Sequence, residues 1–142
     1  MTAERSEILL VEDDSNDIAS TLHAFKTANI ANTIHVARDG VEALERIFGN
    51  GAADVLPNLP KVILLDLNMP RLDGHQVLRR LKDDPRTRAI PVIVLTSSAE
   101  ESDVMRTYDV GANSYIIKPV DIRQFTEAVR EISKYWLEIN HT

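Results

Sequence analysis

Residues 62–66, VILLD, are four consecutive apolar residues followed by an aspartate. A strand that is apolar along its whole length is covered on both faces, which is typical of a parallel sheet. Residues 8–11, 92–95 and 115–117 share this character, and residues 34–37 form a weaker run that contains His35. These runs predict five strands of a sheet buried between two layers.

Segments with helical spacing separate these runs. Apolar residues recur three and four positions apart in five segments. The stripes consist of Ile18, Leu22 and Phe25; Val41, Leu44, Ile47 and Phe48; Val77, Leu78 and Leu81; Val104 and Tyr108; and Ile122, Phe125, Val129, Ile132 and Trp136. Each stripe follows a predicted strand, so the sequence predicts an α/β fold, a (βα)5 doubly wound sheet of five parallel strands.

Length and composition indicate one domain over residues 1–142, with a core of about residues 7–134 and a C-terminal extension over 135–142. The net charge of −6 argues against nucleic-acid binding, which favours a basic face. The chain has no cysteine, which excludes disulfides, thiolate metal sites and cysteine nucleophiles. No run is long enough to span a membrane, and residues 1–7 do not resemble a signal peptide, so we expect a cytoplasmic protein.

Polar residues follow four of the predicted strands. They are Glu12, Asp13 and Asp14 after the first, Asp66 after the third, Thr96, Ser97 and Ser98 after the fourth, and Lys118 after the fifth. Ligands of open parallel sheets bind beyond the carboxyl ends of the strands, where these side chains should meet.

The expected cluster has a specific chemistry. Carboxylates at adjacent strand ends repel one another, and a hard cation such as Mg²⁺ relieves this repulsion. Lys118 and Thr96 offer donors suited to phosphoryl oxygens. A carboxylate nucleophile, a metal site and no evident general base favour phosphoryl transfer onto a carboxylate. Taken singly, each residue could instead be a helix cap or a turn residue, so the prediction depends on their combination.

Four motifs resemble the receiver domain of two-component response regulators. They are ILLVEDD at 8–14, ILLDLNMPRLDG at 63–74, PVIVLTSS at 91–98 and GANSYIIKP at 111–119. The resemblance extends from residue 8 to about residue 136. It implies a flavodoxin-like strand order 2-1-3-4-5, a bound Mg²⁺ that Mn²⁺ or Ca²⁺ can replace, and a sensor histidine kinase as partner. It also implies a phospho-acceptor that assists its own phosphorylation and dephosphorylation and is not otherwise an enzyme.

The resemblance assigns roles to individual residues. Asp66 matches the phospho-acceptor, Asp13 the direct metal ligand, Glu12 a ligand through water, and Asn68 a ligand through its backbone carbonyl. Thr96 matches the switch hydroxyl, Tyr115 the aromatic switch and Lys118 the phosphate-pairing lysine, while Ser97 would leave the pocket open to a phosphohistidine. The Lys118–Pro119 peptide is expected to be cis.

Two features differ from an ordinary receiver domain. The predicted loop over residues 49–60 is long, and the last helix continues past residue 134. Both are similar to freestanding response regulators that partner phytochrome-type histidine kinases, in which a changed surface would carry the signal. Large apolar residues lie on several faces of the extension, namely Tyr135, Trp136, Leu137 and Ile139. We therefore expect a homodimer through the fourth and fifth helices and this extension.

One alternative function stays open and three others are disfavoured. The domain could be a relay intermediate that passes its phosphoryl group to a histidine phosphotransfer protein, and the sequence does not decide this. A Mg²⁺-dependent phosphatase with Asp66 as nucleophile would need an acid two residues later, where Asn68 stands. A pseudo-receiver without chemistry is disfavoured because the acid cluster is complete. The first strand is followed by acids and not by a glycine-rich loop, which disfavours a nucleotide-binding module.

Overall fold

The sheet is parallel and five-stranded, in the order β2-β1-β3-β4-β5, which confirms the predicted topology. The computed structural model describes residues 7–28, 32–49, 56, 59–67, 69, 74–96 and 114–132, the last five through their backbone only. The strands are β1 (Glu7–Val11), β2 (Thr33–Ala37), β3 (Val62–Asp66), β4 (Val92–Thr96) and β5 (Ser114–Ile117).

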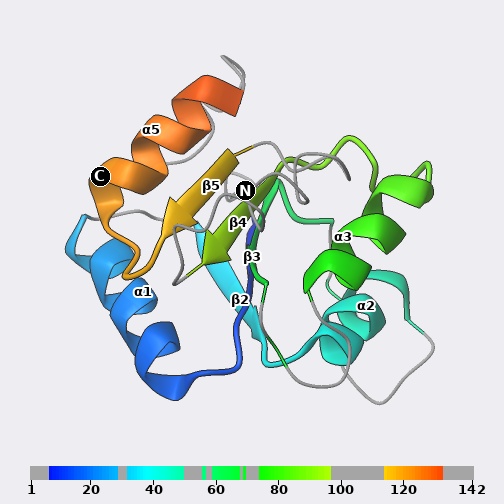
Figure 1. Cartoon of the computed structure of the whole chain (residues 1–142), viewed down its shortest axis with the longest axis horizontal. Coiled ribbons are helices and arrows are strands. Elements are labelled where there is room, and N and C mark those ends of the chain that lie inside the picture. The colour runs from blue at the N-terminus through cyan, green and yellow to red at the C-terminus, as the bar shows by residue number, and fades with distance from the viewer. Residues whose placement is uncertain are drawn as a thin grey trace, which may run out of the picture.

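Helices cover both faces of the sheet. They are α1 (Ser15–Thr27), α2 (Gly40–Phe48), α3 (Gly74–Asp83) and α5 (Ile122–Ile132). Figure 1 shows α1 and α5 on one side of the sheet and α2 and α3 on the other. The predicted helix around Val104 and Tyr108 and the extension over 135–142 lie outside the described residues. Of the helices described, none is long and apolar enough to cross a membrane.

Side chains on the two faces of each central strand belong to two separate hydrophobic cores. In β1, Ile8 and Leu10 pack toward α1 and α5, whereas Leu9 and Val11 pack toward α2 and α3. Phe25 of α1 and Phe125 of α5 meet in the first core with ring centroids 4.6 Å apart. These fully buried strands explain why the sequence lacks the polar alternation of a half-exposed sheet.

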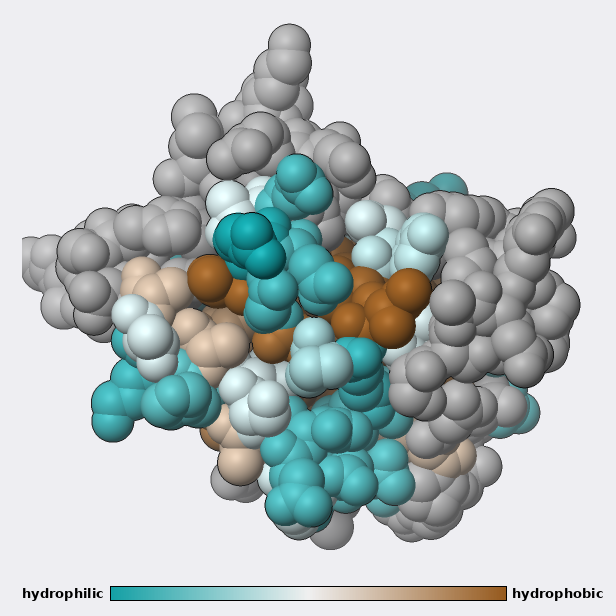
Figure 2. Space-filling model, turned by 60° about the vertical axis from the view of Figure 1, so that its left-hand side comes forward, coloured by the Kyte–Doolittle hydropathy of each residue, from teal (hydrophilic) through white to brown (hydrophobic). Residues whose placement is uncertain are grey.

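The edge strand β5 departs from the expected continuous burial. Ser114 and Ile116 are buried, but Tyr115 is 40% and Ile117 is 38% exposed. The prediction was wrong here because β5 pairs only with β4 and lies at the edge of the sheet. Figure 2, which brings the side of α1 and α5 forward, shows hydrophobic areas between hydrophilic residues on this side of the molecule.

The start of α3 approaches the end of β3 closely. The backbone N–H of Gly74 donates to the Leu67 carbonyl oxygen at 3.1 Å. A Cβ at Gly74 would collide with the Asp66 carbonyl oxygen and would lie 2.7 Å from Leu67 Cα. Only glycine therefore allows α3 to begin against the backbone that carries Asp66.

Replacing Gly74 with alanine is expected to lower the free energy of unfolding by about 2 kcal/mol, because backbone must shift to admit the methyl group. Urea denaturation measures this loss. Arg79→Ala is the matched control, since Arg79 is exposed on the same helix, and its effect should stay within about 0.5 kcal/mol. Equal stability of the two variants would contradict the close approach.

Candidate functional site

The register of the sheet places the polar residues together. Val11 of β1 pairs with Leu65 of β3, so the next residues, Glu12 and Asp66, leave the sheet side by side. The Glu12 N–H donates to the Ala37 carbonyl oxygen at 2.9 Å, which continues the ladder one residue past β1. Both carboxylates therefore stand at the carboxyl edge of the sheet, as expected for a ligand site in this fold.

Three carboxylates gather at this edge. Oxygen atoms of Glu12, Asp13 and Asp66 all lie within 4.8 Å of one another. Glu12 is 1% and Asp66 is 4% exposed, whereas Asp13 reaches solvent. Burial raises the pKa of Glu12 to about 7; the Lys118 ammonium opposes the rise and the charge of Asp66 adds to it. The cluster thus holds more negative charge than its surroundings stabilise.

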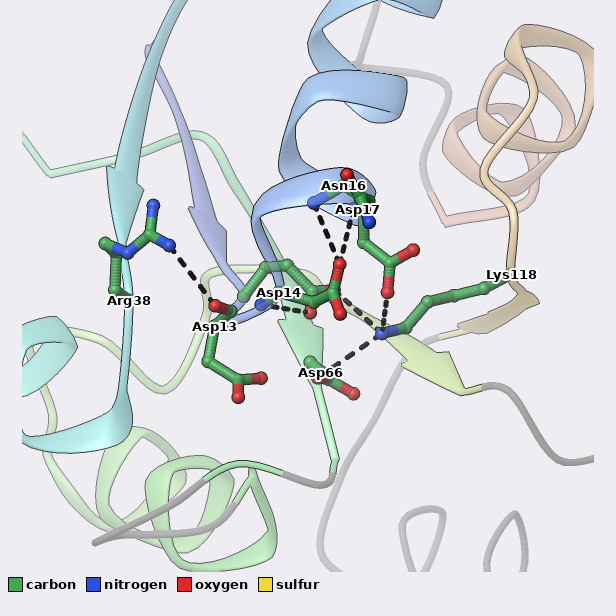
Figure 3. A network of polar contacts seen from close by, with 8 residues as sticks. Asp13, Asp14, Asn16, Asp17, Arg38, Asp66 and Lys118 are labelled. Atoms are coloured by element: carbon green, nitrogen blue, oxygen red, sulfur yellow. Dashed lines mark hydrogen bonds and ion pairs between the residues drawn. The ribbon is translucent and has the colours of Figure 1, made fainter.

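One ammonium group faces this charge (Figure 3). Lys118 Nζ lies 2.9 Å from Glu12 Oε1, 3.0 Å from Asp17 Oδ2 and 3.4 Å from Asp66 Oδ2. Burial alone would lower the pKa of Lys118, but the contacts with Glu12 and Asp17 and the charge of Asp66 raise it above its ordinary value. Lys118 is therefore held charged. The backbone N–H of Lys118 donates to the Thr96 carbonyl oxygen at 2.8 Å, which fixes the Lys118 backbone beside β4.

Two residues of this region were missed at the level of sequence. Asp17, in the first turn of α1, pairs with Lys118. Arg38 follows β2, and its Nη2 donates to the Asp13 carbonyl oxygen at 3.3 Å (Figure 3). The same nitrogen donates to Ser15 Oγ at 2.7 Å. A sequence signal existed for Arg38, which directly follows the end of β2, whereas the contact of Asp17 depends on the orientation of α1.

Hydrogen bonds at the start of α1 stabilise the loop that carries the acidic residues. Asp14 is the N-cap of α1, and its side chain accepts hydrogen bonds from the N–H groups of Asn16 and Asp17 at 2.8 and 3.0 Å. The Asp14 N–H in turn donates to Glu12 Oε2 at 3.2 Å. The helix-cap role weighed for this acidic run therefore holds for Asp14, while Glu12 and Asp13 remain directed to the cluster.

The structure brings Glu12, Asp13, Asp66 and Lys118 together. Thr96 is fully buried at the end of β4, and Tyr115 is half-exposed on β5. The Lys118–Pro119 peptide bond is cis. Asn68, Ser97 and the extension residues Tyr135, Trp136, Leu137 and Ile139 lie outside the described residues.

The donor set fits a divalent cation. Clustered carboxylate oxygens are the ligands that Mg²⁺ and Mn²⁺ use in proteins. The buried carboxylates of Glu12 and Asp66 share the Lys118 ammonium, at 2.9 Å from Glu12 Oε1 and 3.4 Å from Asp66 Oδ2. A divalent cation would neutralise the negative charge that this one ammonium leaves.

The raised pKa of Glu12 should make the metal-free protein less stable as the pH rises. A folded pKa of about 7 against an ordinary value of 4.5 means that the stabilising proton is fully present below about pH 4.5 and is lost through pH 7. We expect the free energy of unfolding, measured with a chelator present, to fall by on the order of 2 kcal/mol between these limits.

Glu12→Gln should remove most of this fall, because the glutamine has the same shape and does not titrate. Asp66→Asn should remove part of it, since the charge of Asp66 contributes to the shift. Asp83→Asn, an exposed change on α3, is the control and should leave the fall intact. Parallel pH profiles for all four proteins would contradict the assignment to Glu12.

Comparison with known proteins gives consistent relatives. A probable methanogenesis regulatory protein, FilR2 of Methanothrix harundinacea, is 40% identical over 137 residues, covering 95% of this chain and 86% of its own. The response regulator Rcp1 of Synechocystis is 37% identical over 131 residues, which cover 92% of this chain and 88% of Rcp1. The solved Mn²⁺-bound form of Rcp1 superposes with a TM-score of 0.75 at 36% identity, covering 96% of this chain and 99% of that one.

A second solved structure is more similar still. The bacteriophytochrome response regulator AtBRR has a TM-score of 0.86 and 42% identity, covering 94% of this chain and 96% of its own. The family model of the response regulator receiver domain matches residues 8–130, which include the whole acidic cluster and Lys118. The chain is therefore a member of the response regulator receiver domain family, related to the regulators associated with phytochromes.

Proposed function

We propose that Asp66 accepts a phosphoryl group from a histidine of a partner sensor kinase, in a reaction that requires Mg²⁺. Receiver domains are phosphorylated by sensor histidine kinases. The observation that carries the proposal is the position of the Asp66 carboxylate, which lies 3.4 Å from the Lys118 ammonium and within 4.8 Å of oxygens of Glu12 and Asp13. A nucleophile, a cation and a metal-binding oxygen cluster thus share one small region.

The residues suit an in-line transfer. An oxygen of Asp66 attacks phosphorus, and the new P–O bond forms while the P–N bond to the donor imidazole breaks. The imidazole leaves with the electron pair of that bond. Asp66 attacks as a carboxylate, so no general base is needed, and Lys118 neutralises charge on the phosphoryl oxygens.

Glu12, Asp13 and Asp66 would hold the cation, with Asp13 and Asp66 as direct ligands and Glu12 through water. We extend the set to the backbone carbonyl of Asn68, which follows Asp66 by two residues. Bound Mg²⁺ neutralises negative charge on the phosphoryl group and the acids. Support comes from a relative, Rcp1, which has been solved in a Mn²⁺-bound form.

We further propose that phosphorylation is read out through β4 and β5. The hydroxyl of Thr96 would move toward the phosphoryl group, and Tyr115 would follow it inward, in a two-state population shift. Ser97 would leave room for the donor imidazole. The positions of the two residues support this readout. Thr96 is the last residue of β4 and lies beside Lys118, and Tyr115 is exposed on the neighbouring strand β5.

The donor is proposed to be a phytochrome-type histidine kinase in the cytoplasm, because AtBRR and Rcp1 are phytochrome-associated regulators. We propose that the protein does not hydrolyse small phosphomonoesters. The residue two positions after Asp66 is Asn68, and an amide cannot serve as the acid that such a hydrolase needs.

Intact-mass spectrometry after incubation with acetyl phosphate tests the proposal. We expect a gain of one phosphoryl group that requires Mg²⁺ and disappears in Asp66→Asn, which keeps the volume of the side chain and removes its nucleophilic oxygen. Asp83→Asn controls for the loss of one carboxylate elsewhere. Phosphoryl incorporation at an aspartate of the Asp66→Asn variant would refute the assignment.

We also propose a homodimer through the fourth and fifth helices and the extension. Its support in the described residues is the exposed apolar pair Tyr115 and Ile117 on β5, next to α5. Size-exclusion chromatography with light scattering should give about twice the 15.9 kDa of one chain. A monomer at about tens of micromolar, with and without phosphorylation, would contradict this.

A further inference from the structure

Lys118 has a partner that neither holds the cation nor accepts the phosphoryl group. Its Nζ donates a hydrogen bond to Asp17 Oδ2 at 3.0 Å, across 101 positions of sequence. The same Nζ lies 2.9 Å from Glu12 Oε1 and 3.4 Å from Asp66 Oδ2. Figure 3 shows Asp17 reaching the Lys118 ammonium from α1.

The Lys118 ammonium already has as many carboxylate neighbours as it has N–H donors. A lysine side chain carries three N–H donors, and three carboxylates lie within 3.4 Å of it, those of Glu12, Asp17 and Asp66. A phosphoryl group on Asp66 brings new oxygen acceptors to the same ammonium. Lys118 can pair with one of them only by giving up part of a contact it already makes.

Asp17 is the contact that is least costly to release. Glu12 is buried and the side chain of Asp66 is only 5% exposed, so either would be left as an uncompensated charge away from water. The side chain of Asp17 is 36% exposed, and water can replace the ammonium there.

Asp17 cannot easily follow Lys118 toward Asp66. Its backbone N–H is bound by the Asp14 side chain at 3.0 Å in the first turn of α1. Ile18, the next residue, is buried in the core shared by α1 and α5. Movement of the Asp17 backbone would therefore disturb the helix cap and the packing of α1, so the lysine side chain is the part that moves.

We propose that Asp17 is a positioning residue that holds Lys118 in the unphosphorylated protein and competes with the phosphoryl oxygens for it. This inference rests on the proposed phosphorylation of Asp66. By this competition Asp17 lowers the affinity of the site for a phosphoryl group and so sets the population of the phosphorylated-like state. Removing its charge should strengthen phosphoryl binding, because the competitor and a nearby repulsion are lost together.

The test uses trifluoroberyllate, which mimics a phosphoryl group on aspartate, with saturating Mg²⁺ and ¹⁹F NMR titration of the full chain. Asp17→Asn should bind it roughly three- to tenfold more tightly than the unmodified chain. Asp17→Glu keeps the charge on a longer side chain and should return the affinity toward that of the unmodified chain. Asp83→Asn removes an exposed carboxylate of α3 and should change nothing.

A second measurement follows the contact itself. The ¹³Cγ resonance of Asp17 should shift when trifluoroberyllate binds, since the carboxylate exchanges an ammonium for water. An unmoved resonance, or an affinity of Asp17→Asn within twofold of that of Asp83→Asn, would overturn the role of Asp17. Failure of the unmodified chain to bind trifluoroberyllate would instead overturn the proposed function, so the two failures are distinguishable.

Discussion

Among the residues that the structure describes, a single ammonium group, that of Lys118, compensates for buried negative charge at the carboxyl edge of the sheet, and the arrangement around it depends on that contact. Glu12 and Asp66 are nearly inaccessible to water, and like charges at this spacing oppose one another. Lys118 lies within 3.4 Å of both. Without it, burying two carboxylates side by side would cost several kcal/mol, a large fraction of the about 5–15 kcal/mol by which domains are stable. The raised pKa of Glu12 shows that the compensation is incomplete.

The fold keeps this charge in place through backbone contacts that apolar packing makes rigid. Parallel pairing of β1 with β3 sets Glu12 beside Asp66, and Gly74 lets α3 start against the Asp66 backbone. A hydrogen bond from the Arg38 side chain links the Asp13 carbonyl oxygen to the end of β2. The two cores on either face of the sheet prevent the strand ends from separating to relieve the repulsion.

The sequence predicted the fold because its strongest signals are local. Continuous apolar runs such as residues 62–65 require burial on both faces, and this alone implies a parallel sheet. The carboxyl-edge residues followed from the parallel orientation of the strands, since all parallel strands end at one edge. Asp17 was not predicted, because its role depends on how the first turn of α1 is rotated toward Lys118, and that angle comes from packing of Ile18 and Phe25. The exposure of β5 depends equally on which strand is at the edge, which no local pattern specifies.

Under the proposed function, the excess charge is what would let a small site change a whole surface. A site that is strained by repulsion when empty gains stability when a cation or a phosphoryl group binds, because ligand binding to the folded state adds to the free energy of unfolding. Under the same proposal Lys118 links this gain to the sheet, since it follows β5 directly and its backbone N–H donates to the Thr96 carbonyl oxygen at the end of β4. A change in the partners of its ammonium therefore acts on the strand that exposes Tyr115 and Ile117. Exchange of one charge-assisted hydrogen bond involves about 1.5–3 kcal/mol, enough to shift a two-state equilibrium roughly ten- to a hundredfold. The carboxylates that destabilise the unliganded protein thus supply the free energy difference on which a switch of this kind depends.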